Sequence, residues 1–385
     1  MTPPWKITDL EFIEGEVHIH VDFERGARFG GCEVHDTSDR KWRHLNFFKY
    51  ACWIHARVPR VKGPGGKVDT VEVPWARPGS GFTMDFEALA IELFSRMPVS
   101  SAAQVLGVTD TRLWRLLRGY VSKCREETTY TQPVRVGVDE TSARKGHDYV
   151  TVFVDLDAKR VLFACQGKDG SALDKFKSFL LERGLAPEKV ESFASDMGPA
   201  FISGIQRVFP GATITLDRYH LVALVSRAVD VTRRAETNGQ KGRKRTRWLW
   251  LKNPSNLNKG ERERLKTLLD ESVFPLTGKA YGLKLAFQDL FLLSQAESSL
   301  AFYEWVAMAL CSGVAAMAST AFTLYKHATM ILEWFKTRIS TGLLEGLHSV
   351  LQAAKAKARG YRNPDNLIAM SYLLHGKLKP ATHTI

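Results

Sequence analysis

The order of strand and helix patterns between residues 134 and 226 constrains the fold of this chain more than any other feature. Valines alternate with other residues over 134–139, which predicts a strand whose two faces have different surroundings. Residues 149–156 and 160–164 predict two more strands, joined as a hairpin at Asp157-Ala158-Lys159. The pattern therefore predicts three consecutive strands that run back and forth.

Helices and strands alternate after these three strands. A helix is expected over 171–183, stopped by Gly184, and a strand that ends at Asp196 follows it. Pro199 suits the first turn of the next helix, and a strand over 213–216 and a long helix come after it. Three strands followed by helix, strand, helix, strand and helix is the order of a ribonuclease-H-like fold, which belongs to the α/β class.

Three carboxylates are the candidate catalytic and metal-binding residues. Asp139 ends the first strand pattern, Asp196 ends the fourth, and Glu345 lies in a helical pattern near the C-terminus. In the predicted fold the two aspartate-bearing strands are neighbours, so their carboxylates converge and repel each other unless a cation lies between them. Oxygen ligands favour Mg²⁺ or Mn²⁺ over Zn²⁺, and two such ions suit a reaction on a phosphodiester. Each acid taken alone is also a common turn former or surface residue.

The third carboxylate is separated from the other two by a long helical segment. Glu345 follows Asp196 by 149 residues, so an all-helical insertion is expected over 227–340. A helix is then expected over 343–359, capped by Gly360. One face of this helix carries polar and basic residues at helical spacing, namely Glu345, His348, Gln352, Lys355 and Arg359. This face is interpreted as a metal ligand beside DNA-contacting residues, and a solvated amphipathic helix is the alternative.

The positive charge of the chain is concentrated in one region. The net charge is +13, and residues 227–266 contain 13 Lys or Arg against 4 Asp or Glu. Concentrated positive charge is typical of a polyanion binder, although a solvated basic surface gives the same count. A cationic segment followed by aromatic residues suits phosphate contacts and base stacking; it consists of Lys241, Arg243, Lys244, Arg245 and Arg247 with Trp248 and Trp250. The two tryptophans are equally well interpreted as core residues.

The remaining composition places few limits on function. The five cysteines are scattered without a Cys-x-x-Cys pair, which indicates a reducing compartment and no disulfide framework. The N-terminus lacks the apolar core of a signal peptide, and the apolar stretch 305–317 is too short to span a bilayer. We therefore expect a cytoplasmic, nucleoid-associated protein with no membrane partner.

Residues 85–130 predict a helix-turn-helix. Ser101 and Gln104 have the spacing of a capping box, Gly107-Val108-Thr109 forms a turn, and a second helix starts near Asp110. This second helix offers Arg112, Arg115 and Arg118 as candidate DNA contacts, in the manner of a recognition helix. An ordinary helical hairpin is the alternative. The residues before it, 1–84, predict a small module of short strands and turns.

Segments along nearly the whole chain resemble the ISL3 family of bacterial insertion-sequence transposases, which are DDE-class enzymes. The segments that carry the resemblance are 42–48, 56–61, 73–83, Gly137-Val138-Asp139-Glu140, Arg144-Lys145-Gly146-His147, Ser195-Asp196-Met197, Asp217-Arg218-Tyr219-His220, Leu251-Lys252-Asn253-Pro254, Glu345-Gly346-Leu347 and 358–363. The resemblance implies that Asp139, Asp196 and Glu345 are the catalytic triad. It also implies cleavage and strand transfer on double-stranded DNA, at terminal inverted repeats, by a homodimer or larger synaptic complex.

The chain departs from the family pattern at two places. Family members often have an N-terminal zinc module with paired cysteines, whereas here the substitute ligands would be Cys32, His35, Cys52 and His55, a doubtful zinc set. Near Glu345 the family commonly has asparagines, whereas this chain has Thr341 and His348. Asp217, His220 and His348 are possible accessory residues of the site; for His220 a buried, hydrogen-bonded structural role is the alternative.

The sequence therefore predicts five parts, one leading function and two alternatives to it. The parts are an N-terminal DNA-binding module (1–84), a helix-turn-helix (85–130), the first part of a ribonuclease-H-like catalytic domain (131–226), a helical insertion (227–340) and the C-terminal helices of the catalytic domain (341–385). The leading function is a Mg²⁺-dependent DNA transposase. The first alternative is a catalytically silent DNA-binding protein derived from a transposase, acting as a repressor or architectural factor. The second is a nuclease that only hydrolyses DNA.

Overall fold

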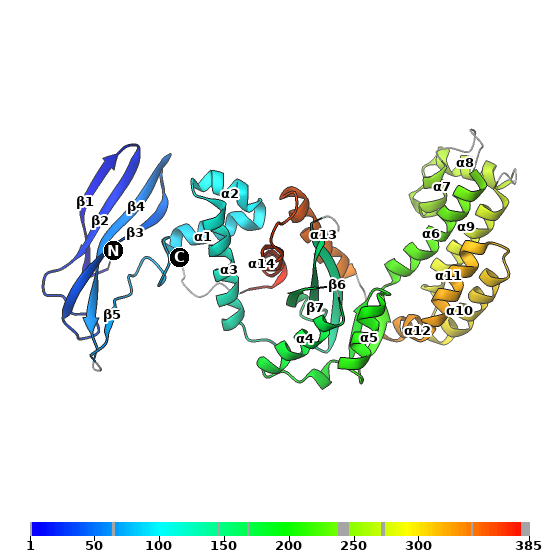
Figure 1. Cartoon of the computed structure of the whole chain (residues 1–385). Helices are drawn as coiled ribbons and strands as arrows, with labels where there is room; N and C mark the ends of the chain where they lie inside the picture. The colour runs from blue at the N-terminus through cyan, green and yellow to red at the C-terminus, as the bar shows by residue number, and fades with distance from the viewer. Residues whose placement is uncertain are drawn as a thin grey trace. The chain divides into compact units, whose positions relative to one another are not determined.

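The computed structural model describes residues 2–63, 66–144, 147–167, 169–237, 246–270, 274–339 and 342–378. The chain divides into two compact units (Figure 1). The first consists of Met1–Thr128, Gln352–Leu374 and Leu378–Ile385, and the second of Thr129–Leu351 and His375–Lys377. Both units contain a five-stranded sheet with parallel and antiparallel pairs.

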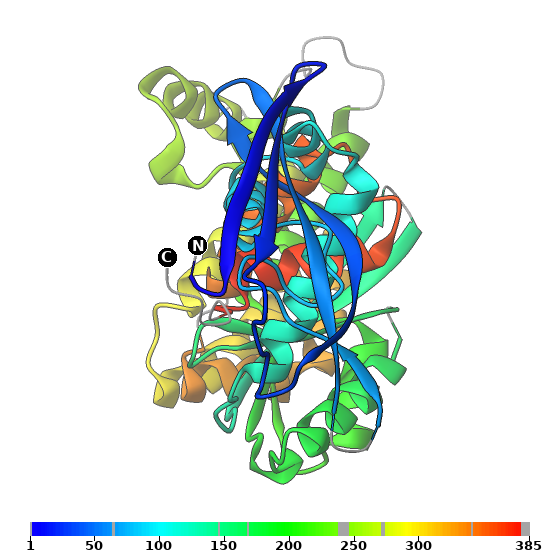
Figure 2. The same cartoon turned by 90° about the vertical axis from the view of Figure 1, so that its left-hand side faces the viewer.

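Four of the five strands in the sheet of the first unit are longer than the short strands that the sequence predicts (Figure 2). The strands of this sheet are β1 (Trp5–Ile13), β2 (Glu16–Phe23), β3 (Val34–Phe47), β4 (Tyr50–Lys62) and the short β5 (Val68–Thr70). The order is β1-β2-β4-β3, with β5 on β4, and β2 and β4 run parallel. One face is apolar, and the ring of Trp75 covers it by edge contacts with Trp5 and Trp42.

Helices α1 (Met84–Arg96), α2 (Val99–Leu106) and α3 (Asp110–Glu127) follow this sheet. Gly107 has φ +66° after α2, so it makes the turn that the sequence predicts. The predicted capping box is wrong, because α2 begins before Ser101. The carbonyl of Pro98 accepts the backbone N–H groups of Ser101 and Ala102, so Ser101 lies inside the helix.

The C-terminal segment packs against α3 within the first unit. The ring of Trp114 contacts Tyr361 edge-on, Arg118 donates a hydrogen bond to Asn366, and the Arg125 guanidinium lies over the ring of Tyr372. Asn366 and Tyr372 belong to α14 (Pro364–His375). Part of the α3 surface is therefore covered by residues that are distant in the sequence.

The sheet of the second unit has the order β10-β9-β6-β7-β8. Its elements are β6 (Arg135–Arg144), β7 (His147–Asp155), β8 (Arg160–Gln166), α4 (Ser171–Glu182), the 3₁₀ turn η1 (Pro187–Lys189), β9 (Ser192–Ser195), α5 (Pro199–Val208) and β10 (Thr213–Leu216). β6, β9 and β10 are parallel, whereas β6, β7 and β8 are antiparallel. Asp155 pairs with Arg160, so the predicted hairpin is confirmed.

The helices that follow β10 share one hydrophobic core with the sheet. They are α6 (Arg218–Thr237), α7 (Arg247–Leu251), the 3₁₀ turn η3 (Pro254–Asn256), α8 (Lys259–Asp270), α9 (Pro275–Leu290), α10 (Gln295–Leu310), α11 (Ala315–Lys326) and α12 (Ala328–Thr337). The last of them, α12, returns to pack against β10. The next helix, α13 (Gly342–Lys357), therefore starts beside the sheet. No helix in the described ranges is long and apolar enough to cross a membrane.

Candidate active site

Asp139 and Asp196 stand at matching positions on two neighbouring parallel strands. The last paired residues of β6 and β9 are Gly137 and Ala194. Asp139 and Asp196 each follow two residues later, so the two side chains leave the sheet on the same face and at the same edge. The convergence that the sequence predicts for these two carboxylates follows directly from this register.

Asp217 extends the same row onto the third parallel strand. Leu216 pairs with Ser195, and the backbone N–H of Asp217 donates to the carbonyl of Ser195 at 2.9 Å, which gives Asp217 the register of Asp196. Its buried carboxylate accepts the backbone N–H of Tyr219 at 2.8 Å. Asp217 therefore caps the first turn of α6.

His220 is held in the site by Asp217. The His220 Nδ1 atom lies 3.1 Å from Asp217 Oδ2, and half of the imidazole is exposed. The hydrogen bond to Asp217 raises the pKa of His220 above its ordinary value, burial opposes this, and the charges of Asp217, Asp139 and Asp196 raise it further. The pKa of His220 is therefore raised by carboxylates on or next to all three parallel strands.

Asp139 does not lie at the end of its strand, in contrast to the sequence prediction. β6 continues to Arg144, because residues beyond Asp139 still pair with β7; Asp139 itself pairs with Val152. Its carboxylate Oδ1 accepts the N–H of Glu140 at 2.7 Å, and Oδ2 lies 3.0 Å from Nδ1 of His348. What ends near Asp139 is only the pairing of β6 with β9, so this carboxylate faces the gap that opens between these strands.

Asp196 is fixed by the turn that leads into α5. Its Oδ1 atom accepts the backbone N–H of Gly198 at 2.9 Å. A Cβ atom on Gly198 would lie 2.9 Å from the same oxygen, so a side chain there would displace the carboxylate. Pro199 begins α5, as the sequence predicts.

Gly137 determines how closely α13 approaches the sheet, a role that the sequence reasoning missed. A Cβ atom at Gly137 would lie 2.6–2.9 Å from the Cγ and Cδ atoms of Leu344. Because glycine has no Cβ, the buried Leu344 side chain packs directly on β6. Glu345, the next residue, is thereby brought to the edge of the sheet that carries the aspartates. A glycine inside a strand pattern is the sequence signal that could have indicated this contact.

The three predicted carboxylates line one pocket. Its volume is about 560 Å³, and its polar lining residues are Asp139, Glu140, Ser195, Asp196, Asp217, Tyr219, His220, Glu345, His348 and Ser349. The apolar floor includes Val138 and Leu344. The structure thus brings Asp139, Asp196 and Glu345 together with the three accessory candidates, Asp217, His220 and His348. Thr341 lies outside the described residues.

The donor set of this pocket fits hard divalent cations, but its side chains are not arranged around one. Carboxylate oxygens from β6, β9 and α13 are the ligands that Mg²⁺ and Mn²⁺ prefer. Within the described residues, however, no three His, Cys, Asp or Glu side chains are placed to hold a metal ion. Asp139 is turned toward His348, and Asp217 toward His220. The carboxylates would therefore have to move closer together to share an ion.

The three arginines predicted to contact DNA have different surroundings on α3. Arg115 is exposed, whereas Arg112 and Arg118 are half-buried. The guanidinium of Arg112 lies 4.5 Å from the ring centroid of Phe82, and Arg118 donates to Asn366. Arg115 is therefore the one of the three that α3 presents most openly.

The basic segment before α7 is only partly described. Lys241, Arg243, Lys244 and Arg245 lie outside the described residues. Arg247 is half-exposed, lies 3.5 Å from Asp230 and stacks over Trp248, which is itself 61% exposed. Trp250 is fully buried against Phe274 and Tyr281, so its interpretation as a core residue is confirmed. The same interpretation is wrong for Trp248, because that side chain is exposed.

Two further predicted DNA contacts lie in the part of the chain that belongs to the first unit. These are Lys355, near the end of α13, and Arg359, which has φ +57° just after the helix. Burial lowers the pKa of Lys355. The backbone N–H of Gly360 donates to the carbonyl of Lys355, so the predicted C-terminal cap is present, although α13 ends at Lys357 rather than Arg359.

The doubtful zinc ligands of the N-terminal module are not assembled. Cys52 and His55 are three residues apart on β4, so their side chains point to opposite faces of the sheet. Cys52 is buried, whereas Nε2 of His55 lies 2.9 Å from Nδ1 of His18. Cys32 contacts the carbonyl of Gly30, and the described residues contain no metal-binding group of three or more such side chains.

Comparisons with known proteins agree with this architecture. A transposase family model for the ISL3 DDE domain matches residues 136–371, and one described as the helix-turn-helix domain of transposase family ISL3 matches residues 71–121. The chain is 26% identical to the transposase for insertion sequence element IS1557 of Mycobacterium tuberculosis, over 89% of this chain and 84% of that protein. It is also 26% identical to the transposase for IS1001 of Bordetella parapertussis, over 86% and 84%.

A solved simian T-cell lymphotropic virus intasome, in complex with PP2A regulatory subunit B56 gamma, aligns at 15% identity over 46% of this chain and 68% of that chain. Its TM-score of 0.18 is too low to say anything about the fold. The ISL3 domain model, in contrast, covers well over half of the chain and includes all three carboxylates. The chain therefore belongs to the ISL3 family of insertion-sequence transposases.

Proposed function

We propose that this transposase binds the terminal inverted repeats of an insertion sequence, cuts the DNA there and joins the freed ends to target DNA. The observation that supports this best is the pocket in which Asp139, Asp196 and Glu345 meet from β6, β9 and α13. The carboxylates of this pocket would repel a DNA phosphate unless divalent cations lay between them. A cluster of acids in a DNA-binding protein therefore favours a metal-dependent reaction on the phosphate.

This proposal assigns a ribonuclease-H-like fold to residues 131–226 and 341–385, although Gln352–Leu374 belong to the first compact unit. The strand order supports this fold, because two parallel strands, β9 and β10, are added beside β6 to the antiparallel strands β6, β7 and β8. Helix α4 connects β8 to β9, and α5 connects β9 to β10. Residues 227–340 are then a helical insertion, since α12 returns to β10 before α13 begins. Residues 1–84 and 85–130 form the N-terminal DNA-binding module and the helix-turn-helix of the same proposal.

Asp139, Asp196 and Glu345 are the residues that would hold Mg²⁺ or Mn²⁺ ions. Two bound ions would polarise the scissile phosphate and lower the pKa of the attacking water. The chain itself positions these ligands: Gly198 fixes Asp196, and the contact between Leu344 and Gly137 fixes the start of α13. Hydrolysis breaks the bond between phosphorus and the 3′ oxygen of the element's last nucleotide, which leaves a 3′-hydroxyl on the element and a 5′-phosphate on the flanking strand. That hydroxyl then attacks a target phosphodiester, and the 3′ oxygen of the cut target strand leaves.

His220 and His348 have separate roles in this proposal. His220, protonated more readily because of Asp217, donates a hydrogen bond to a phosphate oxygen at the edge of the pocket. His348 orients the Asp139 carboxylate through its contact with Oδ2, and it would give up this contact if Oδ2 became a metal ligand. Pairing of two element ends implies a homodimer or larger synaptic complex.

The test is DNA cleavage and strand transfer by the full chain with Mg²⁺ or Mn²⁺. The substrate is a duplex that carries the repeats bordering the gene. The variants Asp139→Asn, Asp196→Asn and Glu345→Gln are each expected to lose cleavage by at least about a thousand-fold, because each removes one ligand charge. Asp157→Asn is the matched control, since this exposed aspartate pairs with Arg135 at the β7–β8 turn.

Two outcomes separate the competing functions. If wild type and the three variants are equally inactive but bind the repeats, the chain is a catalytically silent DNA-binding protein. If wild type hydrolyses DNA but never joins a 3′-hydroxyl oligonucleotide to target, strand transfer is excluded. Cleavage by the wild type that is unaffected by all three substitutions would place the active site elsewhere.

A further inference from the structure

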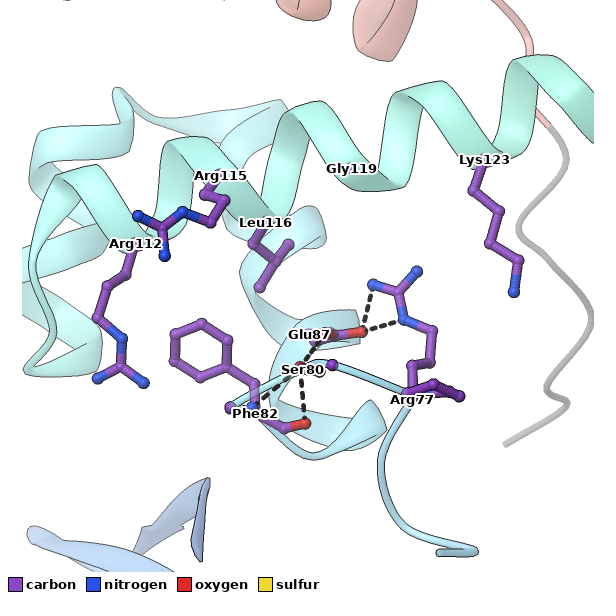
Figure 3. A pocket seen from close by; sticks show the side chains of 12 residues that line it. Arg77, Ser80, Phe82, Glu87, Arg112, Arg115, Leu116, Gly119 and Lys123 are labelled. Atoms are coloured by element: carbon purple, nitrogen blue, oxygen red, sulfur yellow. Dashed lines mark hydrogen bonds and ion pairs between the residues drawn. The ribbon is translucent and has the colours of Figure 1, made fainter. Parts of the chain in front are cut away.

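A second pocket lies on the helix-turn-helix, outside the carboxylate site. It has a volume of about 470 Å³ and is formed between α3, the start of α1 and the segment Arg77–Phe82 (Figure 3). Arg112 and Lys123 project from α3 toward that segment, and Arg115 lies beside Arg112 (Figure 3). We call this the α3 pocket.

The α3 pocket carries excess positive charge. Four cations, Arg77, Arg112, Arg115 and Lys123, line it together with one carboxylate, Glu87. Arg77 is already neutralised, because its guanidinium forms an ion pair with the nearly buried Glu87, which also accepts the hydroxyl of Ser80 at 2.7 Å. The net charge of the lining is therefore +3, and it is contributed by the three cations of α3.

These three cations are poorly compensated by the protein itself. In the described part of the chain no carboxylate forms an ion pair with Arg112 or Arg115. Among the described residues, the ion-pair partner of Lys123 is the exposed Glu127, at 3.7 Å. Burial lowers the pKa of Arg112, and the neighbouring charge of Arg115 lowers it further, so the two guanidinium groups repel each other. An anion placed between them relieves that repulsion.

The guanidinium of Arg112 in the α3 pocket is held in place before any ligand arrives. The rings of Phe86 and Phe82 are stacked with centroids 4.7 Å apart, and the Arg112 guanidinium covers Phe82 at 4.5 Å. The Cβ position of Gly81 is only 3.4 Å from Nη2 of Arg112, so the loop also limits the guanidinium. A planar donor fixed in this way suits the two oxygens of a phosphate.

We propose that the α3 pocket is a phosphate-binding site for the DNA backbone, in which Arg112 and Arg115 grip one phosphodiester and Lys123 contacts a second. The inference rests on the proposed function in so far as DNA is the ligand. It assigns these residues to sequence-independent anchoring, whereas a recognition helix in the major groove would use them to read base edges.

The first test is the salt dependence of DNA binding by the full chain. Arg115→Gln, Lys123→Gln and Arg112→Lys are compared on two duplexes of equal length, one with the bordering repeats and one unrelated. For each lost phosphate contact, the magnitude of the slope of log affinity against log salt concentration falls by about 0.9 on both duplexes. This change corresponds to an affinity about eight-fold lower near 0.1 M salt. Arg112→Lys keeps the charge, so its slope stays while its affinity falls, since a lysine cannot form the two-point contact.

Arg96→Gln is the matched charge control for this experiment. Arg96 lies at the end of α1, is 72% exposed and pairs with Glu92 outside the pocket. Its removal takes the same single charge from the same unit. The slope of this variant is expected to equal that of wild type, and thermal unfolding checks that all variants are folded.

Gly119 allows a second test that changes no charge. It lines the α3 pocket, and a Cβ atom built on it meets nothing within 4 Å. Gly119→Phe should therefore fill the pocket and lower the affinity for both duplexes by about ten-fold, whereas Gly119→Ala, which adds a single methyl group, should lower it far less. Alanine at this position also strengthens the helix, and thermal unfolding of the phenylalanine variant separates a blocked pocket from a lost fold.

The outcomes separate failure of this inference from failure of the proposed function. If Arg115→Gln and Lys123→Gln keep the wild-type slope, or weaken only the duplex with the repeats, the residues read bases and the phosphate site is refuted. Wild-type affinity of Gly119→Phe would refute it as well. If wild type itself binds neither duplex, DNA binding fails and the proposed function is lost together with this inference.

Discussion

Single residues decide how the carboxylates of the candidate active site are brought together. The row Asp139, Asp196 and Asp217 is set by strand register alone, but Glu345 arrives from a helix and needs a close contact. That contact is Leu344 on Gly137, where a Cβ atom has no room. The position of Glu345 in the pocket therefore depends on one missing methyl group.

Gly137→Ala is expected to lower both stability and DNA cleavage. The added methyl overlaps Leu344 and pushes α13 from the sheet, at a cost of about 1–3 kcal/mol in the free energy of unfolding. Thermal unfolding and the cleavage assay measure the two effects. Gly211→Ala is the control, because nothing lies within 4 Å of its Cβ position; equal behaviour of the two variants would show that Gly137 is not a spacer.

Lys284 gives a second prediction at this scale. Its buried ammonium donates to the carbonyls of Trp250, Leu251 and Lys252 at the end of α7, at 3.2, 2.8 and 3.2 Å. Lys284→Met leaves these acceptors without their donor and is expected to cost about 3 kcal/mol of unfolding free energy. Chemical denaturation measures it, and a variant as stable as wild type would contradict the capping role.

The same lysine predicts a dependence of stability on pH. Burial lowers the pKa of Lys284 to about 8, from an ordinary value of 10.5. Between these two values the unfolded chain binds more protons than the folded one, so the free energy of unfolding rises with pH across that window. Chemical denaturation at several pH values in this window measures the free energy of unfolding of wild type and of Lys284→Met. The free energy of wild type should rise with pH relative to that of the variant. A difference between the two that does not change with pH would contradict the assigned pKa.

At the scale of elements, the turn between α2 and α3 fixes the helix-turn-helix. Gly107 has φ +66° and ends α2, whereas Gly119 lies within α3 and has ordinary helical geometry. Gly107→Ala is expected to destabilise the protein by about 1 kcal/mol, and Gly119→Ala to stabilise it by about 0.5–1 kcal/mol. Opposite shifts of the melting temperature test this pair; shifts of the same sign would mean that the turn does not need a left-handed residue.

The elements also show what local sequence patterns are able to predict. β10 lies at the predicted residues 213–216, and the hairpin at 157–159 and the Pro199 helix start were expected, because each depends on neighbouring residues only. The length of β6 was not predicted, because β6 continues to pair with β7 beyond Asp139, where the sequence pattern ends. The partial burial of Arg112 and Arg118 depends on Phe82 and on Asn366, and the latter lies 248 residues from Arg118 in the sequence.

At the scale of the whole molecule, the helical segment between β10 and α13 leaves the sheet and returns to it. Its core is continuous with that of the sheet, and α12 packs on β10. The 149-residue separation between Asp196 and Glu345 therefore does not prevent their meeting in one pocket. We propose that acids from both sides of this long segment hold shared divalent ions, on which DNA cleavage by this family member depends.

The most direct measurement uses electron paramagnetic resonance to detect Mn²⁺ bound to the full chain in the presence of repeat DNA. Wild type is expected to bind two ions per chain with coupled spectra. Asp139→Asn, Asp196→Asn and Glu345→Gln should each lose at least one ion, while Asp157→Asn keeps both. Unchanged stoichiometry and spectra in all three variants would contradict the claim that these carboxylates share the metal ions.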